Sequence, residues 1–262
     1  MEIDHKRASA MNLFNIEGHK AIVTGGTSGL AKAMVEGLLE ARAEVVILAR
    51  NPSLPDIVDQ YRSQGYNVSG VNIDVGDREK LPLAFDKALE ILGGSLDILI
   101  PAAGIQRRNR SENFLLADWD DVLNINLTSV FSLCQMASRV MLPQQRGKII
   151  NIASMLSFFG GLTVPAYAAS KGGVAQLTKA LSNEWASYGV NVNAIAPGYM
   201  RTRMNEGIIS DGPRFESITN RIPAKRWGDP EDLKGVVIFL ASRASDYING
   251  AIIPVDGGYL AF

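Results

Sequence analysis

Short runs of consecutive apolar residues recur along the chain, and amphipathic segments with a helical period separate them. The runs at 21–23 and 45–48 contain no polar position, as is typical of strands that helices cover on both faces of a parallel sheet. The pattern predicts strands at 20–24, 44–49, 66–72, 96–100, 148–153, 190–195 and 251–255. It predicts helices at 28–41, 54–64, 77–92, 117–142 and 166–188.

This alternation predicts one doubly wound α/β domain of the Rossmann type, with a seven-stranded parallel sheet and helices on both faces. Residues 16–262 are expected to form the domain and residues 1–15 an N-terminal arm. The stretch at 198–228 loses its period and is expected to be irregular, and Pro230 is expected to start a further helix. Ligands of such sheets bind beyond the carboxyl ends of the strands. Polar residues that follow strands are therefore the candidates for function.

Composition narrows the classes of function. The 262 residues carry 26 Lys and Arg against 27 Asp and Glu, a formal net charge of -1, which favours a small-molecule partner over nucleic acid. Cys134 is the only cysteine, so no intrachain disulfide forms. No apolar run approaches the roughly 20 residues that span a membrane, and the start of the chain lacks a secretory pattern. We expect a cytoplasmic protein that does not enter membranes.

Histidine chemistry is also disfavoured. His5 and His19 are the only histidines, and neither has cysteine or carboxylate companions at ligand spacing. No metal site is therefore expected. A hydrolase that uses a histidine base would have to draw it from these two residues, and the chain has no Gly-x-Ser-x-Gly motif.

A glycine-rich turn, TGGTSGLA at 24–31, joins the first predicted strand to the first helix. Glycines there allow a sharp turn, and the free amides of the helix N-terminus attract a pyrophosphate. A tight turn needs glycine in any case, but this position in a doubly wound sheet favours a dinucleotide. The pattern lacks the Gly-Lys-Ser/Thr of a P-loop. Candidate pyrophosphate-binding residues are Gly25, Thr27, Ser28, Gly29 and Leu30.

A second constellation joins Ser154, Tyr167 and Lys171 to Asn126. Tyr167 and Lys171 are four residues apart on one predicted helix, so their side chains share a face. Ser154 follows a predicted strand and thus lies at the ligand edge. A phenol with a pKa near 10 becomes a useful acid or base when positive charge nearby favours the phenolate. A tyrosine four residues before a lysine is ordinary on an exposed helix, so the pair alone does not decide.

Together with the glycine turn, this spacing resembles the short-chain dehydrogenase/reductase family. That family has Thr-Gly-x-x-x-Gly-x-Gly, here with Ala31 in the last place, and a thirteen-residue step from serine to tyrosine, here Ser154 to Tyr167. The resemblance implies that the serine hydroxyl binds the substrate oxygen and that the tyrosine transfers the proton. It implies that Lys171 holds the ribose and lowers the tyrosine pKa, and that Asn126 completes a proton relay through water.

The resemblance also implies further cofactor contacts. Besides Tyr167 and Lys171, these are Asp74 and Val75 after the third strand, Ala102, Ala103 and Gly104 after the fourth, and Pro197, Gly198 and Thr202 after the sixth. The family has Asn-Asn-Ala-Gly where this chain has Pro101-Ala102-Ala103-Gly104. We expect this departure to remove hydrogen bonds that tie the strand end to its neighbours and to loosen it locally.

The cofactor itself stays open between NAD and NADP. An acid at the end of the second strand would bond the ribose 2′-hydroxyl, but that position is Ala49. Arg50 follows, and its guanidinium can grip a 2′-phosphate, which favours NADP. The alternative is an arginine that stacks on adenine without reading the phosphate.

The second half most resembles sugar-acid dehydrogenases of this family, many of which prefer NAD. The matching segments are 148–161, 183–186, 191–200, 221–228 and 245–260. This implies a substrate such as 2-deoxy- or 2-keto-3-deoxy-gluconate, with gluconate dehydrogenases next in similarity, and a homotetramer built through two long helices. A carboxylate substrate calls for a cation at the ligand edge. Candidate substrate residues are Arg107, Arg108, Met155 and Tyr199, with Arg201 and Arg203 nearby.

Two alternatives stay open. One is a 3-oxoacyl reductase of the same family, which the near-neutral charge disfavours because a carrier-bound substrate would call for a basic docking patch. The other is a non-catalytic protein that senses dinucleotides on the same fold, which would not need the serine, tyrosine and lysine together.

Overall fold

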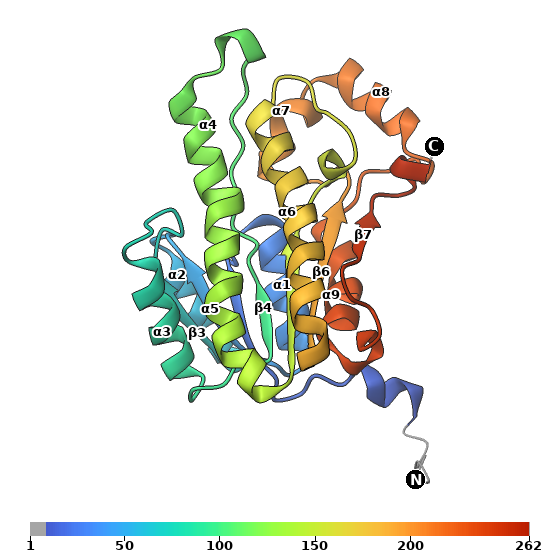
Figure 1. The fold of residues 1–262 in the computed structure, drawn as a ribbon. Helices are drawn as coiled ribbons and strands as arrows, with labels where there is room; N and C mark the ends of the chain where they lie inside the picture. The colour runs from blue at the N-terminus through green and yellow to red at the C-terminus, as the bar shows by residue number, and fades with distance from the viewer. Residues whose placement is uncertain (1–8, 262) are drawn as a thin grey trace.

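The computed structural model describes residues 9–261, and in this part of the chain seven parallel strands form one sheet. Their order is β3-β2-β1-β4-β5-β6-β7, so the direction of winding reverses between β1 and β4 (Figure 1). This confirms the predicted doubly wound sheet. The strands are β1 (Lys20–Thr24), β2 (Glu44–Ala49), β3 (Val68–Asn72), β4 (Ile98–Ile100), β5 (Gly147–Ile152), β6 (Val190–Pro197) and β7 (Ile252–Val255).

Helices cover both faces of the sheet, as the continuous apolar strands require. The α-helices are α1 (Gly29–Glu40), α2 (Leu54–Ser63), α3 (Leu81–Ile91), α4 (Leu116–Leu123), α5 (Ser129–Gln144), α6 (Pro165–Trp185), α7 (Glu206–Ile209), α8 (Gly212–Arg221) and α9 (Lys234–Ala241). Neighbouring residues of a strand point to opposite faces. In β1, Ile22 packs in the core under α3, α5 and α6, whereas Ala21 and Val23 pack in the core under α1, α2 and α9.

The predicted long helix at 117–142 is interrupted. A π-helical turn, η3 (Asn124–Thr128), separates α4 from α5, and the N–H of Ser129 reaches back five residues to the carbonyl of Asn124. The three pieces form one continuous column in Figure 1. π-turns of this kind insert one extra residue and are frequent at functional sites. Here the turn carries Asn126.

The expectation of an irregular stretch at 198–228 is wrong for its middle part, which contains α7 and α8. Phe215, Ile218 and Ile222 recur at helical spacing and pack in a third, smaller core around Trp227. Asp211 caps α8, because its Oδ1 accepts the backbone N–H of Arg214 at 3.3 Å. In Figure 1 both helices lie above the carboxyl ends of β6 and β7.

The N-terminal segment of the described chain packs against α9. Of the predicted arm at 1–15, residues 1–8 lie outside the described part, and the remainder includes a 3₁₀ turn, η1 (Ala10–Phe14), with Phe14 against Phe239 at 6.2 Å between ring centroids. Pro230 starts a 3₁₀ turn, η7 (Pro230–Leu233), which leads into α9. Among residues 9–261, no helix combines the length and the hydropathy that a membrane span requires.

Candidate active site

The turn after β1 has the shape that a dinucleotide needs. Gly25 and Gly29 have φ of +75° and +58°, a region that side chains rarely adopt. A Cβ on Gly25 would lie 3.0 Å from Cα of Ala103, so the chain there admits only glycine. Around Gly29, by contrast, the described atoms leave the space open, and Ser28 makes no side-chain bond to the first turn of α1. The amides at this helix end are thus available to a pyrophosphate, and the turn fits the implied cofactor. Thr27 and Leu30 lie half-buried in the same turn.

At the ends of β2 and β3, Arg50 and Asp74 form an ion pair. Nη1 of Arg50 lies 2.8 Å from Oδ2 of Asp74, and the other carboxylate oxygen accepts the N–H of Gly76 at 2.9 Å. Both side chains of the pair are exposed, and exposed pairs contribute only about 0–1 kcal/mol. A phosphate can therefore compete for Arg50 at small cost. The side chain of Val75 is buried in the core, which leaves its backbone for any ligand contact.

The segment after β4 is tied down despite the missing asparagines. The N–H of Ala103 donates to Oγ1 of Thr24 at 3.0 Å. Asn126 holds Ile105 twice, since its Oδ1 accepts the N–H and its Nδ2 donates to the carbonyl, both at 2.9 Å. Thr24 and Asn126 thus supply hydrogen bonds to this segment without the asparagines, and the local loosening stays a prediction. Ala102 precedes these anchors. Gly104 lies between them, so close to Asn126 that a Cβ on Gly104 would lie 3.3 Å from Oδ1.

Ser154, Tyr167 and Lys171 come together at the carboxyl edge. Ser154 follows β5, and its hydroxyl lies close enough to the phenol of Tyr167 to favour the phenolate of that residue. Tyr167 and Lys171 lie one turn apart near the start of α6, with Nζ of Lys171 5.6 Å from the centre of the Tyr167 ring. The same Nζ donates to the carbonyl of Ile152 at 2.6 Å. Asn126 reaches the group indirectly: its Nδ2 donates to Ser170, whose hydroxyl donates to the carbonyl of Tyr167.

Burial sets the electrostatics of this cluster. It lowers the pKa of Lys171 to about 8 and raises the pKa of Tyr167 above its ordinary value. Two groups oppose the rise at Tyr167, namely the hydrogen bond from Ser154 and the positive charge of Arg108. The sequence implied that Lys171 lowers the tyrosine pKa. In the chain alone, burial prevails, and the groups that favour the phenolate are Ser154 and Arg108.

The four candidate arginines differ in their surroundings. Arg107 is held by α4, with Asp121 at 2.7 Å and Asp118 at 3.5 Å. Partial burial and the charge of Arg214 lower the pKa of Arg108, whose own charge acts on Tyr167 and Tyr199. Among the described residues Arg108 forms no ion pair with a carboxylate. Arg201 lies 3.9 Å from Asp229, and Arg203 is exposed. Only Arg108 is thus both close to the cluster and available.

Met155 and Tyr199 lie beside the cluster, in the small core beneath α8. Tyr199 packs against Trp227, with ring centroids 5.1 Å apart, and Met155 is 5% exposed. The segment after β6 is sterically fixed, since a Cβ on Gly198 would lie 2.6 Å from Cα of Asp256. Pro197 ends β6, and Thr202 precedes the 3₁₀ turn η6 (Arg203–Asn205). The residues after β6 thus lie at the same edge of the sheet as Ser154, because β5 and β6 are parallel neighbours.

Comparison with known proteins identifies the family. Residues 25–260 match the family model described as enoyl-(acyl carrier protein) reductase. The chain is 45% identical over 253 residues to 2-dehydro-3-deoxy-D-gluconate 5-dehydrogenase of Escherichia coli (strain K12), which covers 96% of this chain and 99% of the relative. The chain belongs to the short-chain dehydrogenase/reductase family. This confirms the resemblance seen in the sequence.

Solved structures of the family agree with this fold. A putative 2-deoxy-D-gluconate 3-dehydrogenase from Agrobacterium tumefaciens, with bound NADP, has a TM-score of 0.87 and 47% identity over 96% of this chain and 100% of its own. A gluconate 5-dehydrogenase from Burkholderia cenocepacia J2315, in complex with NADP and tartrate, has a TM-score of 0.93 and 37% identity over 97% of this chain and 100% of its own.

Several contacts of this short-chain dehydrogenase/reductase were missed by reasoning from sequence. Ser157 and Ser170 bond to the backbones of Lys171 and Tyr167, and Arg214 on α8 adds its charge to that of Arg108. Ser157 had a signal, because it lies three residues after Ser154 and closes a capping box with it. Arg214 could be found only together with α8, which lies in the stretch that was expected to be irregular.

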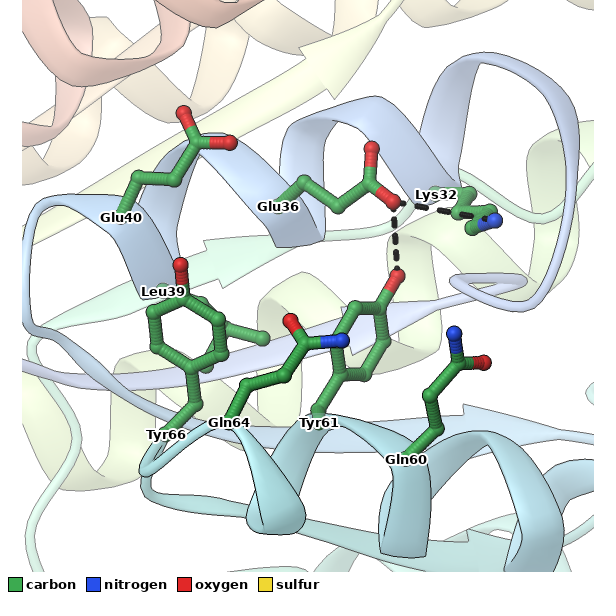
Figure 2. A pocket seen from close by; sticks show the side chains of 8 residues that line it. All are labelled: Lys32, Glu36, Leu39, Glu40, Gln60, Tyr61, Gln64 and Tyr66. Atoms are coloured by element: carbon green, nitrogen blue, oxygen red, sulfur yellow. Dashed lines mark hydrogen bonds and ion pairs between the residues drawn. The ribbon is translucent and has the colours of Figure 1, made fainter.

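A cavity of about 130 Å³ between α1 and α2 lies apart from these residues (Figure 2). Its charged groups are partnered within the chain. Glu36 accepts the hydroxyl of Tyr61 at 3.0 Å and lies 3.7 Å from Lys32, while Glu40 pairs with Lys234 at 2.8 Å. None of the predicted site residues lines it. The candidate active site is therefore the carboxyl edge of the sheet.

Proposed function

We propose that the chain is an NAD(P)-dependent dehydrogenase that transfers a hydride between the nicotinamide and a secondary hydroxyl or keto carbon of a sugar acid. The observation that carries the proposal is the contact of Ser154, Tyr167 and Lys171 at the carboxyl edge, beside the glycine turn. The names of the relatives make 2-dehydro-3-deoxy-D-gluconate the first substrate to test. The NADP in the related structures and the position of Arg50 favour NADP over NAD.

The cofactor would be held along the whole edge. The amides at 25–30 would bind the pyrophosphate, Arg50 the adenosine end, and the segments at 102–104 and 197–202 the nicotinamide end. When bound, the nicotinamide supplies the hydride acceptor or donor together with a positive charge in its oxidised form. Every other step falls to the side chains of the chain itself.

Tyr167 takes the proton of the substrate hydroxyl during oxidation and returns it during reduction. Ser154 donates a hydrogen bond to the same substrate oxygen and fixes it beside the phenol. The Lys171 ammonium keeps positive charge next to the ring and offers donors to the ribose. The side chain of Asn126 is occupied by Ile105 and Ser170, so a water-mediated relay at this position runs through its backbone carbonyl.

Arg108 is the group that we assign to the substrate carboxylate. Its guanidinium is partly desolvated and lies within electrostatic reach of Tyr167, and Arg214 of α8 adds a second positive charge nearby. A guanidinium without a protein carboxylate partner is suited to a bidentate contact with a carboxylate ligand. A sugar acid placed there presents its hydroxyl chain to Ser154 and Tyr167.

The first test replaces the proton-transfer group. Tyr167→Phe is expected to lower kcat with 2-dehydro-3-deoxy-D-gluconate and NADP⁺ at least a hundredfold, while NADP⁺ binding measured by fluorescence titration stays within about threefold. Tyr66→Phe makes the same chemical change in the Figure 2 cavity and serves as the control. A Tyr167→Phe enzyme with more than a tenth of wild-type activity overturns the proposal. So does a wild-type enzyme that reduces 3-oxoacyl thioesters but oxidises no sugar acid.

The second test compares two neighbouring arginines. Arg108→Ala is expected to raise KM for the sugar acid about ten- to a hundredfold, because it removes a charge-assisted contact of about 1.5–3 kcal/mol. Arg107→Ala should change KM less than threefold, since that guanidinium is held by Asp118 and Asp121. Steady-state kinetics of both variants measures the difference. Equal effects at the two positions would remove the carboxylate assignment.

We further propose that the enzyme works in the cytoplasm as a homotetramer built as a dimer of dimers. Exposed apolar residues on the column of α4 and α5 support the assembly, namely Leu116 at 79% and Phe131 at 43% exposure.

A further inference from the structure

Ser157 connects the segment that carries Ser154 to the helix that carries Tyr167 and Lys171. It ends η4 (Met155–Ser157), a single 3₁₀ turn after β5, and its side chain points back toward α6. Its hydroxyl donates a hydrogen bond to the backbone carbonyl of Lys171 at 2.7 Å and accepts the backbone N–H of Ser154 at 3.3 Å. One hydroxyl thus bridges two of the three residues of the cluster.

The bridge closes a ring of polar contacts. From Lys171, the chain of contacts returns to the strand, because Nζ donates to the carbonyl of Ile152 at 2.6 Å. The end of β5 and the first turns of α6 are therefore joined by two side-chain bonds, one in each direction. Without the Ser157 bond, the turn at 155–157 would still pack against α6, but no hydrogen bond among the described residues would join the two.

The orientation of the Ser154 hydroxyl depends on the same turn. Oγ of Ser154 accepts the backbone N–H of Leu156 at 3.2 Å, so its rotamer follows the position of the turn. Because the turn is fixed to α6 by Ser157, the hydroxyl is aligned with the phenol of Tyr167 on that helix. Misplacement of reacting groups by about 1 Å can lower a rate about a hundredfold.

We propose that Ser157 is a positioning residue for the reaction, which sets the Ser154 hydroxyl against Tyr167 by tying the 155–157 turn to the backbone of α6. The inference rests on the proposed function and deepens it. The Ser157 hydroxyl is engaged by two backbone groups, the N–H of Ser154 and the carbonyl of Lys171. We therefore expect it to act on the reaction through the position of Ser154 and not by contact with the substrate. If Ser157 had only a structural role, its loss would lower stability without changing how the Ser154 hydroxyl is placed relative to the Tyr167 hydroxyl.

Three variants distinguish these roles, with 2-dehydro-3-deoxy-D-gluconate and NADP⁺ as substrates. Ser157→Ala is expected to lower kcat about ten- to a hundredfold and to leave KM for NADP⁺ within about threefold. Ser157→Thr keeps the hydroxyl and should recover most of the rate. Ser63→Ala removes an exposed hydroxyl that bonds only to the carbonyl of Gln60, and it should change kcat less than twofold. Thermal melting of each variant gives the folded fraction.

The decisive measurement is a double-mutant cycle with Ser154→Ala. If Ser157 acts through Ser154, adding Ser157→Ala to Ser154→Ala lowers kcat less than twofold further. Ser157→Ala alone should also raise the midpoint of the acid limb of kcat/KM for oxidation, because the Ser154 bond favours the phenolate. An equal loss in both backgrounds, or no loss with Ser157→Ala, overturns the inference and leaves the proposed function standing. The proposed function fails separately, through an active Tyr167→Phe enzyme.

Discussion

At the scale of single residues, Arg50 is the position at which we expect the choice between NADP and NAD to be made. Arg50→Ala is expected to weaken NADP binding about tenfold, which is near the lower end for a charge-assisted contact. The effect is small because Asp74 competes with the phosphate for the wild-type guanidinium. NAD should lose little. The ratio of kcat/KM with NADP to kcat/KM with NAD measures this change in preference, which we expect mainly in KM. Ala49→Asp should deepen it by repelling the phosphate. Equal weakening of both cofactors would show an arginine that only stacks on adenine.

The buried charge of Lys171 lowers the stability of the folded chain. Burial holds its pKa at about 8 against 10.5 in an open chain, so the folded state disfavours the charged lysine. The cost is complete below pH 8 and disappears as the pH rises toward 10.5. The lowered pKa of Lys171 decreases the free energy of unfolding by about 3 kcal/mol below pH 8. The hydrogen bond to Ile152 offsets about 1 kcal/mol of this decrease.

Lys171→Met should therefore raise the melting temperature of the cofactor-free protein at pH 7, and the gain should shrink between pH 8 and pH 10.5. Thermal melts across this range test the expectation. A variant that melts below wild type at pH 7 contradicts it.

At the scale of residues, the sequence predicted which side chains lie together wherever the prediction depended on their spacing along the chain. The four-residue step from Tyr167 to Lys171 and the position of Ser154 after a buried strand were sufficient to bring the three residues together. The two arginines after β4 could not be separated in the same way. Arg107 and Arg108 are neighbours of the same type, and the difference between them arises from Asp118 and Asp121 on α4.

Among the elements, the strands were the most predictable part, because a run that is apolar on both faces has few other places in a fold. The short helix α8 was missed although Phe215, Ile218 and Ile222 follow a helical period. The whole stretch at 198–228 was expected to be irregular, whereas Asp211 caps α8 and Pro213 stands in its first turn. The π-turn could not be predicted, since one inserted residue leaves the apolar pattern of α4 and α5 nearly unchanged.

For the whole molecule, the exposed apolar residues of the α4–α5 column predict assembly. The protein is expected to sediment as a tetramer at micromolar concentration. Phe131→Glu is expected to shift the equilibrium toward smaller species, because it places a charge on a surface that lies 43% exposed in the isolated chain. Analytical ultracentrifugation of both proteins measures this, and a stable wild-type monomer would contradict it.

The strand order has a consequence for synthesis. On one side β1 pairs with β2, which follows shortly after it, but its other neighbour is β4, whose first residue, Ile98, comes only after α3. A nascent chain that stops short of Ile98 therefore presents one edge of β1, with Ala21, Ile22 and Val23, without its final partner. Such an edge is a template for pairing with other chains. Emergence of β4 from the ribosome is thus the event that closes this apolar edge of the growing sheet.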